Sequence, residues 1–283
     1  MNFSNTDVPF NHAGCALGGI KKLEPRNCKY LLSSRTLTLS LVLITIIVSA
    51  SAVHASGVVV IRENVAAAKR DELTQKLRLI TGWSKLAFDE KGFLQLNEVE
   101  THSGSAAARK LLSNSLNSNN VVVIEDASSR GDVAFCRVVP GRWVNGDKSS
   151  PAFVILIDFS DFKQLLGDNQ ARAAFDVGWG FLHELDHVVA DSKDAAEEGQ
   201  LGECEDHINV MRSEVGLPLR VSYFFSESTL KSDPNFGNKL VRLAFEKYDD
   251  AKARTRRFWL VWDSTAVGGL STRQQTAAVQ SAH

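Results

Sequence analysis

The chain has 283 residues, of which 44% are hydrophobic and 23% charged, and this excludes the low-hydrophobicity, high-charge composition of a disordered protein. Its 32 basic side chains almost balance the 33 acidic ones, for a formal net charge of -1. A chain this close to neutrality has no overall field that would attract nucleic acid, so we expect no nucleic-acid partner.

The first 55 residues differ from the rest of the chain. They hold five basic and two acidic residues, and the 18 residues from Thr36 to Val53 contain no charge. A basic leader, an apolar run and small residues such as Val53 and Ala55 are typical of a secretory signal peptide. We predict cleavage after Ala55, giving a secreted or periplasmic protein with no membrane association after cleavage. An uncleaved signal anchor is the alternative, because 18 uncharged residues can just span a bilayer.

Residues 56–266 are predicted to form one α+β domain, and residues 267–283 a disordered tail. Leucines at helical spacing predict helices at 70–80 and 105–116, the second capped by Ser105. Short apolar, β-branched runs predict the strands, which are a hairpin over 85–96 and single strands at 121–125, 134–139 and 152–158.

The second half of the domain is predicted from the same signals. A helix is expected at 171–190, followed by a polar, acidic loop to residue 202. A second helix is expected at 203–215, ended by Gly216 and Pro218. The remaining elements are a helix-like stretch at 238–248, a basic run at 252–257 and an apolar strand at 258–262.

Residues His183-Glu184-Leu185-Asp186-His187 form the pattern H-E-x-x-H, which is typical of zinc hydrolases. On a helix, the four-residue spacing places His183 and His187 one turn apart on the same face, so both imidazoles can bind one Zn²⁺. Glu184 lies beside them, where its carboxylate can act as general base for a water that attacks a carbonyl. We therefore predict that His183 and His187 are metal ligands and that Glu184 is the catalytic residue.

The alternative is a surface helix whose histidines and glutamate merely pair with neighbouring residues. The motif, however, is surrounded by apolar side chains, namely Phe181, Leu182, Leu185, Val188 and Val189. Two histidines on one turn of a buried helix are costly without a metal or a hydrogen-bonding partner, and this favours the metal site.

A catalytic zinc also needs a third protein ligand and an open position for water. No third histidine follows His187 at the spacing of the metzincins, so the ligand should be an acidic residue on the next helix. Glu203 and Glu205 both border the apolar stripe of that helix, and Asp206 points farther away. We prefer Glu203, with Glu205 and Asp206 as the alternatives.

The helix Phe181–His187 and the segment Gly202–Arg220 together resemble the zincin-type metallopeptidase domains of bacterial effectors and toxins. In those domains H-E-x-x-H is followed by a helix reading roughly Asn-x-x-Arg-x-Glu-x-Gly-x-Pro, matched here by Asn209, Arg212, Glu214, Gly216 and Pro218. The resemblance implies a zincin-like fold and a zinc-dependent peptidase acting on a protein or peptide substrate. The crowding of acidic residues means that the third ligand cannot be carried over from the family pattern.

Several other residues are candidates for smaller roles. His207, Arg220 and Tyr223 follow the proposed third ligand and could donate hydrogen bonds to a tetrahedral oxyanion, although such residues are more often structural. Asp186 is most simply a solvated helix charge. Cys136 and Cys204 are the cysteines that remain after signal cleavage and could form one disulfide, and Cys204 lies on the apolar stripe, as core or disulfide residues do.

The sequence therefore predicts an exported zincin that hydrolyses peptide bonds, with Zn²⁺ as its cofactor. Two other hypotheses remain: a catalytically silent zincin-like binding module with a structural zinc, and a toxin-like hydrolase with a single protein target. A purely structural site has no need of a general base, so the presence of Glu184 argues against the silent module.

Overall fold

The computed structural model describes residues 57–96, 103–128, 130–227 and 240–268. The predicted signal peptide and its cleavage site lie outside these ranges, and so does the chain from residue 269 onward. Val267 and Gly268, which begin the predicted tail, belong to the folded part: Val267 is buried, and the Gly268 N–H donates to the carboxylate of Asp161.

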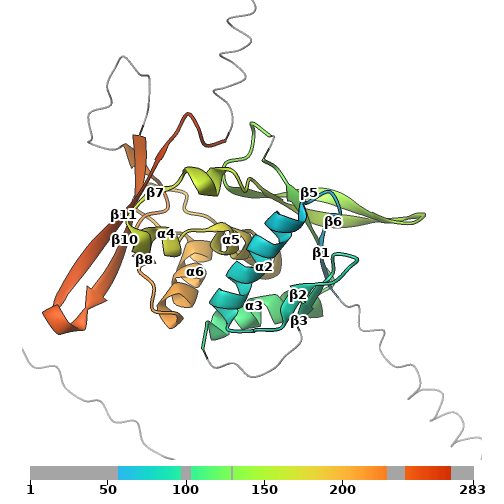
Figure 1. Cartoon of the computed structure of the whole chain (residues 1–283), viewed down its shortest axis with the longest axis horizontal. Helices are drawn as coiled ribbons and strands as arrows, with labels where there is room; N and C mark the ends of the chain where they lie inside the picture. The colour runs from blue at the N-terminus through green and yellow to red at the C-terminus, as the bar shows by residue number, and fades with distance from the viewer. Residues whose placement is uncertain (1–56, 97–102, 129, 228–239, 269–283) are drawn as a thin grey trace, which may run out of the picture. The chain divides into compact units, whose positions relative to one another are not determined.

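A four-stranded sheet supports the predicted metal-binding helix (Figure 1). Its strands lie in the order β1 (Val58–Ile61), β4 (Val121–Asp126), β6 (Lys148–Ile157) and β5 (Cys136–Asn145). The first three are parallel, whereas β5 pairs with β6 as an antiparallel hairpin and forms one edge of the sheet. Strand β1 was not among the predicted elements.

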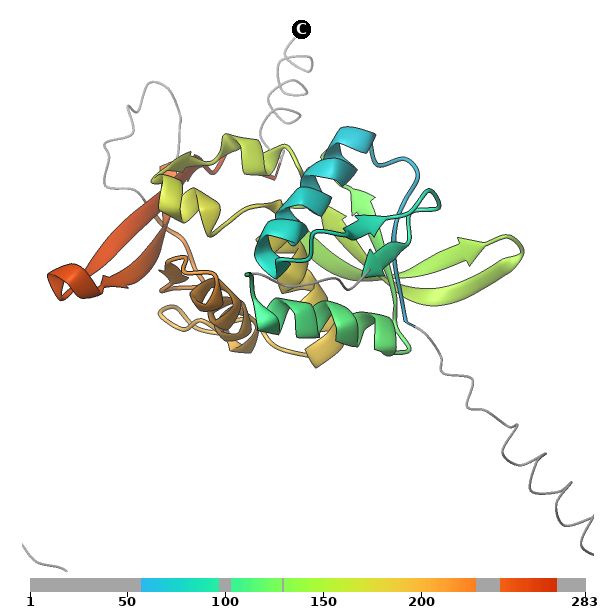
Figure 2. The same cartoon turned by 60° about the horizontal axis from the view of Figure 1, so that its bottom comes forward.

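Side chains of the sheet alternate between two apolar clusters, as the period of two in a strand requires. Ile61, Ile124 and Ile155 pack into the main core, while Val60 and Val123 belong to a cluster on the other face. Helices α2 (Ala67–Thr81), α3 (Ala106–Asn117) and α5 (Val177–Ala190) share the main core with the sheet (Figure 2).

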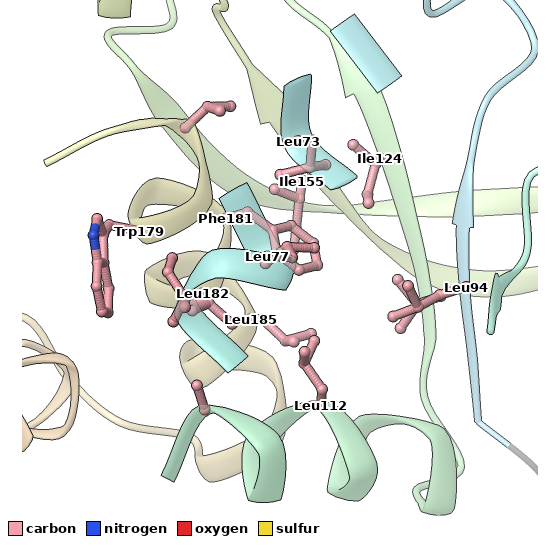
Figure 3. Packing of buried hydrophobic residues seen from close by; sticks show 14 of the residues in the cluster. Leu73, Leu77, Leu94, Leu112, Ile124, Ile155, Trp179, Phe181, Leu182 and Leu185 are labelled. Carbon is pink, nitrogen blue, oxygen red and sulfur yellow. The ribbon is translucent and has the colours of Figure 1, made fainter. Parts of the chain in front are cut away.

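Helix α5 is held at the centre of this core. Its Leu182 and Leu185 are fully buried and meet Leu77 of α2 and Leu112 of α3 (Figure 3). Burying a leucine contributes about 1.5–3 kcal/mol, so the helix that carries the H-E-x-x-H pattern is anchored on several sides.

The predicted single helix at 171–190 is wrong in one respect, because the structure divides it. Helix α4 (Asn169–Ala173) ends before Asp176, and α5 begins at Val177. The Asp176 carboxylate accepts hydrogen bonds from the N–H groups of Gly178 and Trp179, at 3.0 and 3.4 Å. This side-chain cap starts a new helix and gives α5 its own N-terminus.

The predicted helix-like stretch at 238–248 is wrong: the structure has strand β10 (Leu240–Asp249) there. Val241, Leu243 and Phe245 alternate toward the interior and are buried, a period of two that only a sheet can use. Strand β10 pairs antiparallel with β11 (Arg254–Asp263), which contains the predicted strand and most of the basic run. The short strands β7 (Leu166–Gly167), β8 (Leu219–Arg220) and β9 (Ser226–Glu227) complete this second sheet.

Most other local predictions are confirmed. The expected hairpin is formed by β2 (Leu86–Phe88) and β3 (Leu94–Leu96), and Ser105 caps α3 by accepting from the Ala108 N–H at 2.9 Å. Helix α6 (Glu203–Glu214) occupies the predicted range and is followed by Gly216 at a φ of 70°. Among the described residues there are five α-helices and small sheets of mixed direction, which is an α+β fold.

The described residues belong to one compact unit. No helix within the described ranges is long and apolar enough to cross a membrane.

Candidate functional site

Helix α5 places His183, Glu184 and His187 together, as the spacing predicts. The ring centroids of the two histidines are 4.9 Å apart, and their side chains are only 13% and 15% exposed. Because the helix is buried on its leucine face, these polar side chains lie at the border of the core, where burial strengthens their interactions.

Both imidazoles direct Nε2 toward one carboxylate oxygen, Oδ1 of Asp194. The distances are 3.1 Å from His183 and 3.4 Å from His187. The Tyr223 hydroxyl also hydrogen-bonds to Asp194, and its ring stacks on His183 with 6.1 Å between centroids. Two imidazole nitrogens and a carboxylate oxygen within this distance of one another are a donor set that zinc and related metals use.

Asp194 reaches the histidines because the loop after α5 folds back along the start of α6. Asp194 forms an isolated β-bridge with Gly202, and the Cys204 N–H donates to the Lys193 carbonyl at 3.2 Å. Gly202 has a φ of 80°, and a Cβ there would lie 2.6 Å from the carbonyl carbon of Asp194. Only glycine allows this close approach, so Gly202 helps to determine the position of the carboxylate.

The opposite nitrogen of each histidine faces an acceptor. His187 Nδ1 lies 2.9 Å from the Ser192 carbonyl oxygen, and His183 Nδ1 lies 3.5 Å from Oε2 of Glu205. An acceptor at Nδ1 favours the tautomer that leaves Nε2 unprotonated, and such partners usually orient histidines that bind metals.

The electrostatics of the group show that it attracts positive charge. The hydrogen bond to Asp194 is the main cause that raises the pKa of His187 to about 11. Burial alone would lower the pKa of His183, but Asp194, Cys204 and Glu205 together raise it well above its ordinary value. Burial acts against ionisation of Asp194 too, yet the two histidines hold its pKa well below the usual range. Because a metal ion competes with protons for the same atoms, this is also a favourable place for a dication.

Cys204 supplies a fourth donor atom to the same group. One donor atom from each of His183, His187, Asp194 and Cys204 lies within 4.8 Å of the others, so the four side chains could hold a metal ion. The thiol is buried and donates to the His183 carbonyl at 3.3 Å. Cys204 belongs to the main apolar core, which was one of its two predicted places, whereas the alternative of a disulfide is wrong because Cys204 and Cys136 are both free thiols.

The structure does not place Glu203, the preferred third ligand, in this group. Glu203 is exposed at the start of α6, and Asp194 is the carboxylate that approaches the histidines. The predicted ligand was sought among the acidic residues of α6, whereas the loop before α6 brings Asp194 to the histidines. The signal for Asp194 was an acidic residue seven positions after His187, in a segment interpreted as a plain loop.

The two alternative ligands have different surroundings. Asp206 is exposed, whereas Glu205 is buried and paired with two arginines. Oε2 of Glu205 lies 2.9 Å from a terminal nitrogen of Arg220, and Oε1 accepts from Arg212. Although burial opposes ionisation, the two guanidinium groups hold the pKa of Glu205 well below its usual range. Glu205 is therefore a charged carboxylate whose Oε2 faces His183 Nδ1, on the ring side opposite Asp194.

Asn209 and Glu214 fix the position of helix α6, which carries Glu205. The Asn209 side chain exchanges two hydrogen bonds with the backbone of Arg220, both at 2.9 Å. The carboxylate of Glu214 accepts from the Ser105 hydroxyl at 2.6 Å and from the Ala107 N–H at 3.0 Å, and so ties α6 to the start of α3.

Glu184 lines a cavity of about 140 Å³ next to His183. Its Oε2 accepts a 2.9 Å hydrogen bond from the backbone N–H of Val138 on the edge strand β5. Burial raises the pKa of the Glu184 carboxyl, in opposition to the two nearby histidines. The carboxylate is thus fixed at one oxygen, and its other oxygen has no hydrogen-bond partner among the described residues.

The remaining candidates separate into two groups. Arg220 and Tyr223 line the cavity, but His207 does not; it binds the carboxylate of Asp186 at 2.8 Å. Asp186 is buried and also accepts from the Ser192 hydroxyl at 2.7 Å, so its interpretation as a solvated charge is wrong.

Comparison with known proteins adds no relative: no protein-family model, no curated protein and no solved structure matches the chain.

Proposed function

We propose that the chain is an exported, zinc-dependent peptidase with a zincin-like fold. The observation that carries the proposal is the convergence of His183 Nε2 and His187 Nε2 on Asp194, with Glu184 beside them in a cavity. His183, His187 and Asp194 would hold the ion, in place of the ligand set with Glu203.

The donor set suits zinc better than magnesium or calcium. Those two ions prefer six or more oxygen ligands, whereas imidazole nitrogen and one carboxylate are the usual partners of catalytic zinc. Zinc bound there would supply Lewis-acid chemistry, polarising a carbonyl and making water more acidic.

Glu184 is suited to move a proton during this chemistry. The Val138 N–H holds Oε2, which leaves Oε1 free to accept a proton from a water in the adjoining cavity. A carboxylate positioned in this way accelerates a reaction by about 10²–10⁴ as general base. The cavity beside it has room for a side chain of the substrate.

Export is part of the proposal and rests on the basic leader and the apolar run over residues 36–53. Protein recovered from outside the cytoplasm should begin near Ser56. A soluble cytoplasmic chain that retains its first 55 residues would contradict it.

One observation favours the alternative of a silent module with a structural zinc. Cys204 brings the number of donor side chains to four, and structural zinc sites are closed by four protein ligands. In the silent module the Cys204 thiol would bind the metal and Glu184 would have no catalytic role. In the peptidase the thiol would stay unbound and Glu184 would act as general base.

The test of the proposed function is the substitution Glu184→Gln. The purified wild-type protein should contain about one zinc per chain and cleave peptides, and the variant should keep its zinc and melting temperature while hydrolysis falls by about 10²–10⁴. Asp206→Asn is the matched control, because this exposed acid lies outside the donor group. Unchanged hydrolysis in Glu184→Gln would remove the peptidase hypothesis, and wild-type protein that binds no zinc would remove the metal site.

A further inference from the structure

The cavity next to Glu184 is lined by both aromatic and charged side chains. Its walls are aromatic and come from Phe135, Phe175, Trp179 and Tyr223, but Glu205, Arg212 and Arg220 also line it. Two guanidinium groups therefore share a single carboxylate, with Arg212 on Oε1 of Glu205 and Arg220 on Oε2.

The Asp176 carboxylate also attracts Arg212, but it is paired with Lys76 at 2.9 Å and does not offset this excess. In the proposed zinc enzyme, the two positive charges of the ion are matched by Asp194 and by Glu184, and the two histidines are neutral ligands. One positive charge of the arginine pair then remains without a counter-charge, although Arg220 donates from Nε to the Ser222 carbonyl and from a terminal nitrogen to the Tyr223 carbonyl. A buried charge without a counter-charge is costly, so the site favours an anion.

Arg212 is a buried residue of this lining, and several contacts fix its side chain. Its side chain is 2% exposed, and its guanidinium carbon lies 5.4 and 5.6 Å from the ring centroids of Trp179 and Phe245. Nε donates to the Ala174 carbonyl, and one terminal nitrogen donates to Glu205 and Asn209. The second terminal nitrogen has no hydrogen-bond partner among the described residues, although the side chain lines the cavity.

We propose that this cavity binds a carboxylate group of the peptide substrate, so that the enzyme cleaves next to an acidic residue or next to a free C-terminus. The inference rests on the proposed peptidase function. A carboxylate can accept a charge-assisted hydrogen bond from the second terminal nitrogen of Arg212, and the aromatic walls can contact the methylene groups that carry it. The size agrees, because a cavity of about 150 Å³ holds a molecule as large as benzene.

Four matched peptides distinguish the two sources of the carboxylate. An interior position near the scissile bond carries Glu or Gln, and the C-terminus is either free or amidated. A charge-assisted hydrogen bond in a buried site is worth about 10- to 100-fold in affinity, so kcat/KM should favour the Glu peptides, or the peptides with a free C-terminus, by this factor.

The matched variants Arg220→Gln and Arg220→Lys test whether charge is the cause. Arg220→Gln removes the excess positive charge, so the preference should fall close to one, whereas Arg220→Lys should keep most of it. The melting temperatures and zinc contents of both variants show whether they are folded and loaded.

Binding of glutarate, with glutaramide as its uncharged control, gives a readout that does not need hydrolysis. Calorimetry should show tighter binding of the acid to wild-type protein and to Arg220→Lys, with the difference lost in Arg220→Gln. The Arg220 dependence also separates the cavity from direct binding of the carboxylate to zinc.

The results separate failure of this inference from failure of the proposed function. Equal cleavage of all four peptides together with equal binding of the acid and the amide would overturn the carboxylate site and leave the peptidase. Cleavage of none of them, with Arg220-dependent binding of the acid, would overturn the peptidase and support the anion site. Neither cleavage nor selective binding would overturn both.

Discussion

Substitution of Asp194 is the sharpest test of the donor group, because the structure puts this residue in the place that the sequence argument gave to Glu203. Asp194→Asn keeps the size of the side chain but removes the charge of a carboxylate oxygen that lies 3.1 and 3.4 Å from the two histidines. We expect zinc binding to weaken strongly in this variant and to stay unchanged in Glu203→Gln.

The magnitude follows from the number of ligands. Zinc bound by four ligands is worth about 10–16 kcal/mol in small peptides, which is about 2.5–4 kcal/mol for each ligand. Loss of one ligand should therefore raise the dissociation constant by about 10²–10³. Since zinc stabilises the folded state in proportion to the logarithm of this constant, the stabilisation at a fixed free zinc concentration should fall by about 2.5–4 kcal/mol.

The assay is the rise in melting temperature on addition of zinc, measured for wild type and both variants. For a domain of 150–250 residues, 1 kcal/mol shifts the melting temperature by about 2–4 °C, so the rise should be about 5–16 °C smaller in Asp194→Asn. The difference with and without zinc also removes the contribution of the ion pairs that Asp194 forms with the histidines in the metal-free protein. A full zinc response in Asp194→Asn and none in Glu203→Gln would refute this reasoning and restore the original ligand set.

Two predictions concern the fold. Burial raises the pKa of Asp161 from 3.8 to about 6, so its contribution to the free energy of unfolding is full below pH 3.8 and is lost as the pH rises through 6. Between pH 5 and 7.5, wild type should therefore lose about 1 kcal/mol that Asp161→Asn does not lose. Urea unfolding at each pH measures this difference. Leu185→Ala should cost about 2–5 kcal/mol because this side chain is fully buried, whereas Leu79→Ala at a 74% exposed position should change the unfolding free energy by less than about 0.5 kcal/mol.

The parts of the fold that could be predicted are those whose signals lie close together in the chain. A serine cap, a glycine after a helix and leucines at helical spacing predict α3 and α6 because each depends on neighbours within one turn or two. The same locality explains the proposed metal-binding pair: residues four apart on a helix meet whatever surrounds them, so the proximity of His183 and His187 could be predicted without the fold.

The parts that could not be predicted depend on partners that are distant in sequence. Strand β10 is a strand because β11 pairs along its whole length, and its alternation is hidden by polar residues that a helix would also accept. Asp186 is buried only because His207 and Ser192 reach its carboxylate. Asp194 approaches the histidines through the path of a loop, which has no periodicity to reveal it.

Cys204 decides between an open and a closed metal site, and the proposed function makes a definite prediction for it. The thiol is fully buried and already donates to the His183 carbonyl, and a bound thiolate would occupy the position that the attacking water needs. We therefore expect the cobalt-substituted protein to show no thiolate-to-metal charge-transfer absorption in the near ultraviolet.

The matched variant extends this test to zinc itself. Cys204→Ser should retain zinc and peptide hydrolysis, because the serine hydroxyl can donate to the same carbonyl. The expected loss is one of stability, about 1–3 kcal/mol for a more polar group in a buried position. Strong charge-transfer absorption in wild type that disappears in Cys204→Ser, together with loss of zinc, would make Cys204 the fourth ligand. The site would then be closed, Glu184 would have no water to act on, and the structural-zinc module would replace the peptidase.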